Sequence, residues 1–183
     1  MKKLIIFLLF TISFLAGCSA ADSAKEVVGI ETLDEYLTEE RIDRRMESLE
    51  RLDSYYQSTN DEDLKGDAIE QLIDEYILKY EAKARDLSVN EEEVQDVIDF
   101  NIETAKKGQN ENFKNYLDEM DMTVEEYYKE YAYESIKGKL LENKLNDEIT
   151  ANGEKWDDYK KKVIADYREK NDAEINNLME KEN

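Results

Sequence analysis

The sequence contains no histidine and no proline, a single cysteine, Cys18, and six glycines. Without histidine the chain cannot form a Ser-His-Asp triad or the usual zinc sites, and it lacks the most common general base. One cysteine cannot close a disulfide within the chain or build a Cys-based metal site. We therefore expect a protein that is not an enzyme and that needs no cofactor and no metal. The absence of proline also permits long uninterrupted helices.

The charge of the chain is strongly acidic. Asp and Glu number 46 against 25 Lys and Arg, which gives a net charge of −21 at pH 7. Nucleic acid is disfavoured as a partner because its phosphates carry the same sign of charge. The charge also repels anionic lipid headgroups, keeps a protein with apolar surface soluble, and attracts basic stretches of unfolded chains.

The N-terminus has the layout of an export signal. Met1-Lys2-Lys3 precedes an apolar run from Leu4 to Leu15, which is too short to span a bilayer, and Leu15-Ala16-Gly17-Cys18 follows. Small residues before a cysteine are typical of a lipobox, in which Cys18 is alkylated by diacylglycerol and becomes the mature N-terminus. The alternative is an ordinary secretory signal with a fortuitous cysteine.

We expect three regions: a lipoprotein signal peptide over 1–17, a lipidated tether over 18–28, and a helical domain over 29–183. The signal holds two Lys and no acid, so its removal takes the net charge from −21 to −23. Two or three acyl chains, at about 0.8 kcal/mol per buried methylene, would hold the protein at the extracytoplasmic face of the cell membrane. Ser19 and the Lys/Asn/Glu-rich composition favour a single-membrane bacterium, although the envelope type stays open.

The apolar residues recur at helical spacing almost throughout, which predicts an all-α fold of about six helices in one domain. Three pairs have the spacing of an N-terminal capping box: Thr32 and Glu35, Asn90 and Glu93, and Thr123 and Glu126. The expected helices carry their apolar residues over Ile42–Tyr56, Leu64–Tyr80, Val94–Ile102, Phe113–Met120, Val124–Ile149 and Trp156–Tyr167. The second should be central to the core and the fifth the longest, ending at Asn152-Gly153. The polar end of the chain should fray.

Several short patterns occur in the order of a known helical domain. They are Leu72-Ile73-Asp74-Glu75-Tyr76-Ile77-Leu78 with Glu81-Ala82-Lys83-Ala84, the connection Leu87–Val94, Phe113-Lys114-Asn115-Tyr116-Leu117 with Met122–Tyr127, and Trp156-Asp157-Asp158-Tyr159. From about Val27 to Ile175 the chain resembles the N-terminal chaperone domain of the SurA/PrsA group of extracytoplasmic folding factors, which is related to the substrate-binding part of trigger factor. The resemblance implies a SurA N-terminal-like fold.

The resemblance also implies a chaperone that binds unfolded or newly exported polypeptides. The best-known foldases of the group continue into a parvulin domain, which we expect to be absent here because the sequence contains none of its histidines, so prolyl isomerase activity is not implied. The alternative is a structural or regulatory lipoprotein that binds one specific folded envelope partner. A third possibility, a small hydrolase, would need a buried carboxylate pair. The clients and the oligomeric state stay open.

Twelve tyrosines offer apolar faces with hydrogen-bonding tips. Adjacent helical residues diverge by about 100°, so one member of Tyr55-Tyr56 and one of Tyr127-Tyr128 should lie at a rim. The predicted client-binding residues are Tyr76, Tyr80, Tyr127, Tyr128, Tyr131 and Tyr133. Asp61-Glu62-Asp63-Leu64-Lys65-Gly66 begins like a calcium loop, but Lys65 stands at its fifth position and Leu72 where a Glu should close it. We interpret it as an acidic turn that opens a helix.

Overall fold

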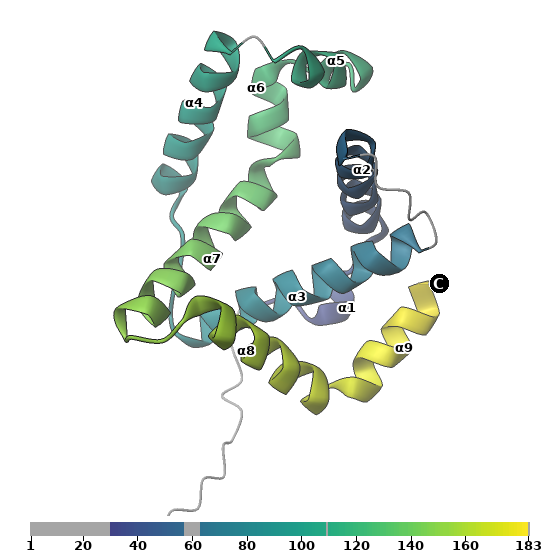
Figure 1. Cartoon of the computed structure of the whole chain (residues 1–183), viewed down its shortest axis with the longest axis vertical. Helices are drawn as coiled ribbons and strands as arrows, with labels where there is room; N and C mark the ends of the chain where they lie inside the picture. Colours follow the sequence, from purple (N-terminus) through teal and green to yellow (C-terminus); the bar gives the residue numbers. More distant parts are fainter. Residues whose placement is uncertain (1–29, 57–62, 109, 183) are drawn as a thin grey trace, which may run out of the picture.

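The structure is a computed structural model that describes residues 30–56, 63–108 and 110–182, and every regular element in these ranges is helical (Figure 1). The elements are α1 (Leu33–Tyr36), α2 (Glu39–Tyr56), α3 (Leu64–Ala84), α4 (Glu91–Lys107), α5 (Glu111–Glu119), α6 (Val124–Glu126), the π-helical turn η1 (Tyr127–Tyr131), α7 (Tyr133–Ala151), α8 (Trp156–Lys170) and α9 (Asp172–Glu182). The all-α prediction is confirmed. Cys18, the predicted signal and tether, and the Tyr55 and Tyr56 side chains lie outside the described residues.

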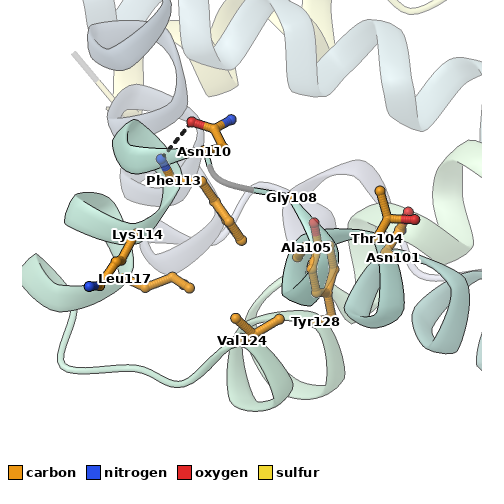
Figure 2. A pocket seen from close by; sticks show the side chains of 10 residues that line it. All are labelled: Asn101, Thr104, Ala105, Gly108, Asn110, Phe113, Lys114, Leu117, Val124 and Tyr128. Atoms are coloured by element: carbon orange, nitrogen blue, oxygen red, sulfur yellow. Dashed lines mark hydrogen bonds between the residues drawn. The ribbon is translucent and has the colours of Figure 1, made fainter.

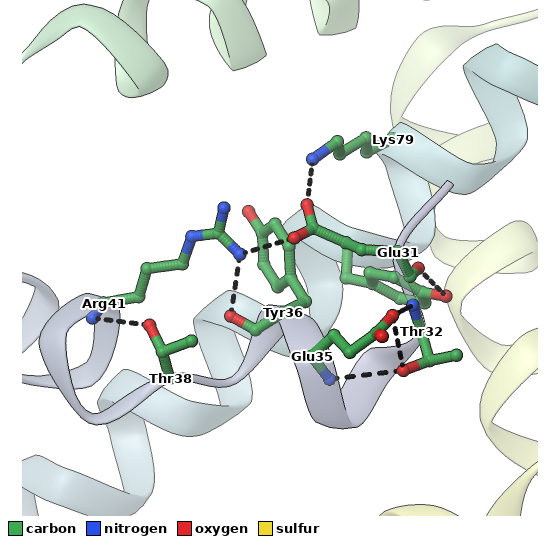
Figure 3. Close-up of polar contacts among 8 residues, drawn as sticks. Glu31, Thr32, Glu35, Tyr36, Thr38, Arg41 and Lys79 are labelled. Carbon is green, nitrogen blue, oxygen red and sulfur yellow. Dashed lines mark hydrogen bonds and ion pairs between the residues drawn. The ribbon is translucent and has the colours of Figure 1, made fainter. Parts of the chain in front are cut away.

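All three predicted capping boxes are present, and they open α1 (Figure 3), α4 and α6. At α4 the Glu93 N–H donates to Asn90 Oδ1 at 2.9 Å, while the Asn90 N–H donates to Glu93 Oε2 at 2.9 Å. Each box satisfies N–H groups that have no partner inside the helix, which explains why these sequence positions start helices. Gly153 has a φ of 85° and ends α7 as expected.

The helix α3 is the centre of the fold, as its wide apolar stripe predicted. It contacts α1, α2, α7 and α8. In Figure 1, α4 and α7 run side by side in opposite directions as an arm that leaves one end of α3, and α5 lies across the far end of this arm. On the other side α2 rises from α3 toward α5, while α8 returns along α3 and leads into α9.

The buried apolar residues form three separate clusters, which we call base, elbow and arm. The base cluster joins α1, α2, α3 and α9 through residues such as Ile42, Ile73 and Tyr76. The elbow cluster joins α3, α7 and α8, and the arm cluster centres on Val94, Ile98 and Ile102 of α4. Because the apolar burial is divided among three small cores, much of the arm's apolar surface is only half-buried.

The predicted long helix from Val124 is interrupted, because η1 separates α6 from α7. At the interruption the Ala132 N–H donates to the carbonyl oxygen of Tyr127 at 2.8 Å, five residues back. A π turn adds one residue to the helical repeat. Residues five positions apart are offset by about 140° around a regular α-helix. The extra residue of the π turn reduces this offset, and Tyr128 and Tyr133 both pack against the arm cluster.

The expectation that the C-terminal end frays is wrong. The described residues form α9, in which Ile175 and Leu178 are 5% and 4% exposed within the base cluster. The two residues lie three positions apart, so they share one helix face and dock it despite the polar residues around them. Lys181 Nζ and Asp34 Oδ1 lie 2.9 Å apart and tie the end of α9 to α1.

Candidate functional site

A hollow of about 510 Å³ lies at the far end of the arm, where the end of α4, the helix α5 and the start of the α6–η1 segment meet (Figure 2). Its lining residues are Asn101, Thr104, Ala105, Gly108, Asn110, Phe113, Lys114, Leu117, Val124 and Tyr128. Local caps place the elements around it. The Phe113 N–H donates to Asn110 Oδ1 at 3.2 Å and starts α5, and the Thr123 capping box starts α6 just before Val124.

The inner lining of the hollow is apolar. Figure 2 shows Phe113 and Leu117 of α5 directed toward the same space as Val124 of α6 and Tyr128 of η1. Val124 and Tyr128 also pack against the arm cluster, so this lining is anchored to the core of the arm. An apolar side chain that enters the hollow gains about 25 cal/mol for each Å² of apolar surface removed from water.

The α4 side of the hollow is polar. Within the described part of the chain, the side chains of Asn101 and Thr104 make no hydrogen bond, and Asn110 uses only its oxygen, toward Phe113. Amide and hydroxyl groups both donate and accept. They can therefore pair with the N–H and C=O groups of a polypeptide backbone whatever its sequence.

Phe100 extends the apolar surface beyond the hollow. It is 66% exposed, the one large hydrophobic side chain that the described residues leave on the surface. It lies one helical turn before Thr104 on α4, and residues four apart share a helix face. A chain segment that contacts Thr104 can thus also contact the Phe100 ring.

A tyrosine cluster lies beside the hollow, with Tyr127 at its centre. The Tyr127 ring centroid is 5.2 Å from that of Phe113, 5.8 Å from that of Tyr116 and 5.4 Å from that of Tyr131. Burial raises the pKa of both Tyr127 and Tyr128 above the usual value, so both phenols are neutral at physiological pH. The structure thus brings together three of the predicted residues, Tyr127, Tyr128 and Tyr131.

The helix α2 contacts this cluster through charged side chains. The Arg51 guanidinium carbon lies 3.7 Å from the centroid of the Tyr116 ring. Arg44 Nη1 donates to the carbonyl oxygen of Tyr131 at 3.3 Å, and the Tyr131 hydroxyl donates to Glu47 Oε2 at 2.9 Å. Burial and the hydrogen bond to Glu47 both raise the pKa of Tyr131.

The other predicted tyrosines lie elsewhere. Tyr133 packs on the arm cluster, and its hydroxyl donates to Glu91 Oε2 at 2.6 Å, which raises the pKa of Tyr133 to about 12. Tyr76 is a correction: it is 4% exposed in the base cluster, and its hydroxyl donates to the carbonyl oxygen of Glu31 at 3.1 Å, so it presents almost no surface to a client. Tyr80 is half-buried against Tyr76 and Tyr167.

The described residues show no site of other chemistry. None of their Asp or Glu side chains is buried, and no group of three possible metal ligands gathers among them. Asp63 opens α3 by accepting the Gly66 N–H at 2.9 Å, while Asp61 and Glu62 lie outside the described ranges. None of the helices in those ranges has the length and apolarity needed to cross a bilayer.

Sequence reasoning did not single out Phe100 or the polar residues of the hollow. The sequence did contain one signal for Phe100. This residue lies outside the apolar stripe of Val94, Ile98 and Ile102, so helical periodicity places its large aromatic side chain on the polar face of α4. The hollow itself depends on three elements meeting. Helical periodicity in any one of them carries no information about that.

The fold and the hollow define a helical domain with an open arm, and comparison with known families identifies it. A family model described as the SurA-like N-terminal domain matches residues 1–146. The chain belongs to this family. The match includes the hollow and the tyrosine cluster and ends within α7. No curated protein and no solved structure matches the chain.

Proposed function

We propose that the protein is a membrane-anchored, extracytoplasmic, chaperone-like lipoprotein that holds unfolded or newly exported polypeptides without prolyl isomerase activity. The observation that carries the proposal is the hollow at the end of the arm, which has an apolar inner lining and, in Asn101 and Thr104, side chains that make no hydrogen bond to the described residues. Membership of the SurA-like N-terminal family supports a polypeptide-binding role for this domain.

The hollow suits an extended chain better than a folded surface. Apolar side chains of the client contact Phe113, Leu117 and the exposed Phe100, while Asn101 and Thr104 pair with its backbone. Backbone recognition is independent of sequence, so specificity is low. The contacts are few and weak, so exchange is fast. The net charge of −21 attracts clients with basic stretches.

A lipid on Cys18 would keep this activity next to the membrane. The support is the sequence layout of the N-terminus, in which a short apolar run and small residues precede the single cysteine. The acidic domain is repelled by anionic headgroups. It would therefore stand away from the bilayer, where emerging chains can reach the arm.

Light scattering tests the chaperone activity. The soluble chain from Ser19 to Asn183, at stoichiometric excess over a chemically unfolded client, should suppress the client's aggregation. Phe100→Ser should weaken this suppression several-fold, because it removes an exposed contact and leaves the core untouched. Ala165→Ser, an exposed change on α8, is the matched control. The proposal fails if the wild-type chain leaves aggregation unchanged, and the assignment to the hollow fails if Phe100→Ser matches the control.

A further inference from the structure

The surface formed by Tyr116, Tyr127 and Tyr131, which we call the tyrosine surface, is covered by cations that belong to the protein itself. The Arg51 guanidinium carbon lies 3.7 Å from the Tyr116 ring centroid, and the Arg44 guanidinium carbon lies 5.0 Å from that of Tyr131. Both distances are within the range of a cation–π interaction. The surface is therefore able to hold guanidinium groups.

The described side chains that form this cover are charged. The described side chains of α2 that enter an apolar core are those of Ile42 and Met46, and both belong to the base cluster, not to the arm. Among its described side chains, Arg44, Glu47 and Arg51 contact the arm, and these contacts are polar or cation–π in kind. Such contacts are weak where water reaches them, so the two arginines can be displaced.

Within the described ranges, one polar group of the tyrosine surface is unsatisfied. The Tyr116 hydroxyl oxygen is buried and has no hydrogen-bond partner among the described residues. An unpaired buried hydroxyl is costly, because it has given up its bonds to water. The backbone of a client segment that reaches the tyrosine surface carries donors and acceptors that can pair with this hydroxyl.

We infer that the tyrosine surface is a binding site for arginine side chains of client polypeptides, and that Arg44 and Arg51 occupy it in the free protein. The inference rests on the proposed function, because it places a second contact beside the hollow. Phe113 lines the hollow and also meets the Tyr127 ring edge to face, so one extended client segment reaches both. A client arginine takes the place of Arg51 on Tyr116 or of Arg44 on Tyr131.

The site favours arginine over lysine. A planar guanidinium stacks on an aromatic face and presents paired donors, whereas an ammonium is a compact and strongly hydrated charge. Glu47 lies at the edge of the surface, where it accepts the Tyr131 hydroxyl, and its carboxylate suits a guanidinium fork. A lysine-bearing client should thus bind more weakly than an arginine-bearing one of equal charge.

Removal of the internal arginines provides the test. Binding of a labelled, unstructured Gly/Ser peptide with two arginines is measured by fluorescence anisotropy on the full chain in mild detergent. Arg44→Gln and Arg51→Gln should each bind it about fivefold more tightly than wild type, the size of one partly exposed cation–π contact. Arg45→Gln is the matched control, because Arg45 lies on the same helix but pairs with Glu75 of α3.

Arg45→Gln makes the same change in net charge. Any gain in peptide affinity that it shares with the other two variants therefore comes from long-range electrostatic attraction. The inference is overturned if Arg44→Gln and Arg51→Gln bind no better than Arg45→Gln. It is also overturned if Arg44→Gln and Arg51→Gln raise the affinity for peptides with lysine or glutamine in place of arginine by the same factor. Circular dichroism shows whether each variant folds, and Arg51→Lys, which keeps the charge, should show a smaller gain.

A second measurement needs no variant. In the wild-type chain, the arginine peptide should shift the ring resonances of Tyr116 and Tyr131 and leave that of Tyr159, which is held by Arg85 in the elbow. Unchanged Tyr116 and Tyr131 resonances at saturating peptide contradict the inference. Suppressed aggregation of an arginine-free client would show in that case that the proposed function stands and only the arginine site fails.

Discussion

Tyrosine occurs in two settings in this chain, the base cluster and the arm. Tyr36, Tyr76 and Tyr167 pack ring against ring in or against the base cluster, with Tyr76 centroids 5.4 Å and 6.1 Å from those of Tyr36 and Tyr167. Tyr127 and Tyr131 of the arm are only half-buried. A buried phenol needs a partner for its hydroxyl, and Tyr76 has one in the carbonyl of Glu31. Residue type alone does not distinguish the two groups.

The first prediction concerns Tyr76. Tyr76→Phe should lower the free energy of unfolding by about 1 kcal/mol, because it removes the 3.1 Å hydrogen bond to Glu31 and leaves that carbonyl without this donor. Suppression of client aggregation should not change. Urea unfolding and the light-scattering assay measure the two quantities. Loss of suppression with unchanged stability would return Tyr76 to the client-binding surface.

The docking of α9 shows how a mostly polar helix is held by two residues. Ile175 and Leu178 lie on one face and enter the base cluster beside Leu33 and Ile73. Polar residues separate them along the sequence, so the mean hydropathy of this segment does not predict that the helix packs against the core. A narrow apolar stripe suffices where the partner surface is already in place.

A second prediction follows from this docking. Leu178→Ala should lower the free energy of unfolding by about 2–4 kcal/mol, because it leaves a cavity in the base cluster. Asn177→Ala changes the neighbouring exposed residue and should have almost no effect. Urea denaturation of both variants provides the comparison. Equal stability of the two would mean that α9 does not dock in solution.

The capping box of α4 makes that helix sensitive to pH. A hydrogen bond from Lys144, and then the Asn90 backbone N–H, hold the pKa of Glu93 below its usual value. Lys144 belongs to α7, so this carboxylate links the two helices of the arm. Because the folded pKa lies below the unfolded one, the stabilisation is present above the unfolded pKa and is lost as the pH falls through the folded pKa.

The third prediction is a change in pH dependence. The difference in unfolding free energy between wild type and Glu93→Gln should be largest near neutral pH and should shrink as the pH falls from about 5 to about 3. Glu92→Gln is the matched control, because Glu92 is exposed and makes no hydrogen bond among the described residues. Denaturation at several pH values measures the difference. A constant difference would contradict the role of the charge.

The division of the core into three clusters makes the molecule open. Val163 packs against both the base and elbow clusters, and Val89 against both the elbow and arm clusters, so single side chains join neighbouring cores. At the elbow, Arg85 bridges helices by donating to Glu148 Oε1 at 2.9 Å and to the Tyr159 hydroxyl at 2.7 Å. The arm is thus positioned by the elbow, while the hollow at its far end stays accessible.

The fourth prediction concerns where the whole molecule resides. In a bacterium that processes lipoproteins, the wild-type protein should sediment with the membranes, and Cys18→Ser should move it to the soluble fraction. In the proposed lipoprotein, two or three acyl chains would supply the membrane affinity that an acidic domain lacks. Ser19→Ala, the neighbouring change, should leave the protein in the membrane fraction. Sedimentation of Cys18→Ser with the membranes would refute the lipid anchor.

The sequence was enough for the helical class, the three capping boxes, the central place of α3 and the family resemblance. These features are local, because a cap needs a Thr or Asn three residues before a Glu, and a stripe needs apolar residues at helical spacing. The resemblance to the SurA/PrsA group was carried by such short patterns, and the family match agrees with it.

Contacts between distant residues decided the rest. The Tyr131 hydroxyl meets Glu47 across 84 positions, and Lys181 meets Asp34 across 147. The break at η1, the docking of α9, the burial of Tyr76 and the hollow beside Phe113 all depend on which helices become neighbours. Helical periodicity indicates which face of a helix is apolar, but the packing of the helices determines what covers that face.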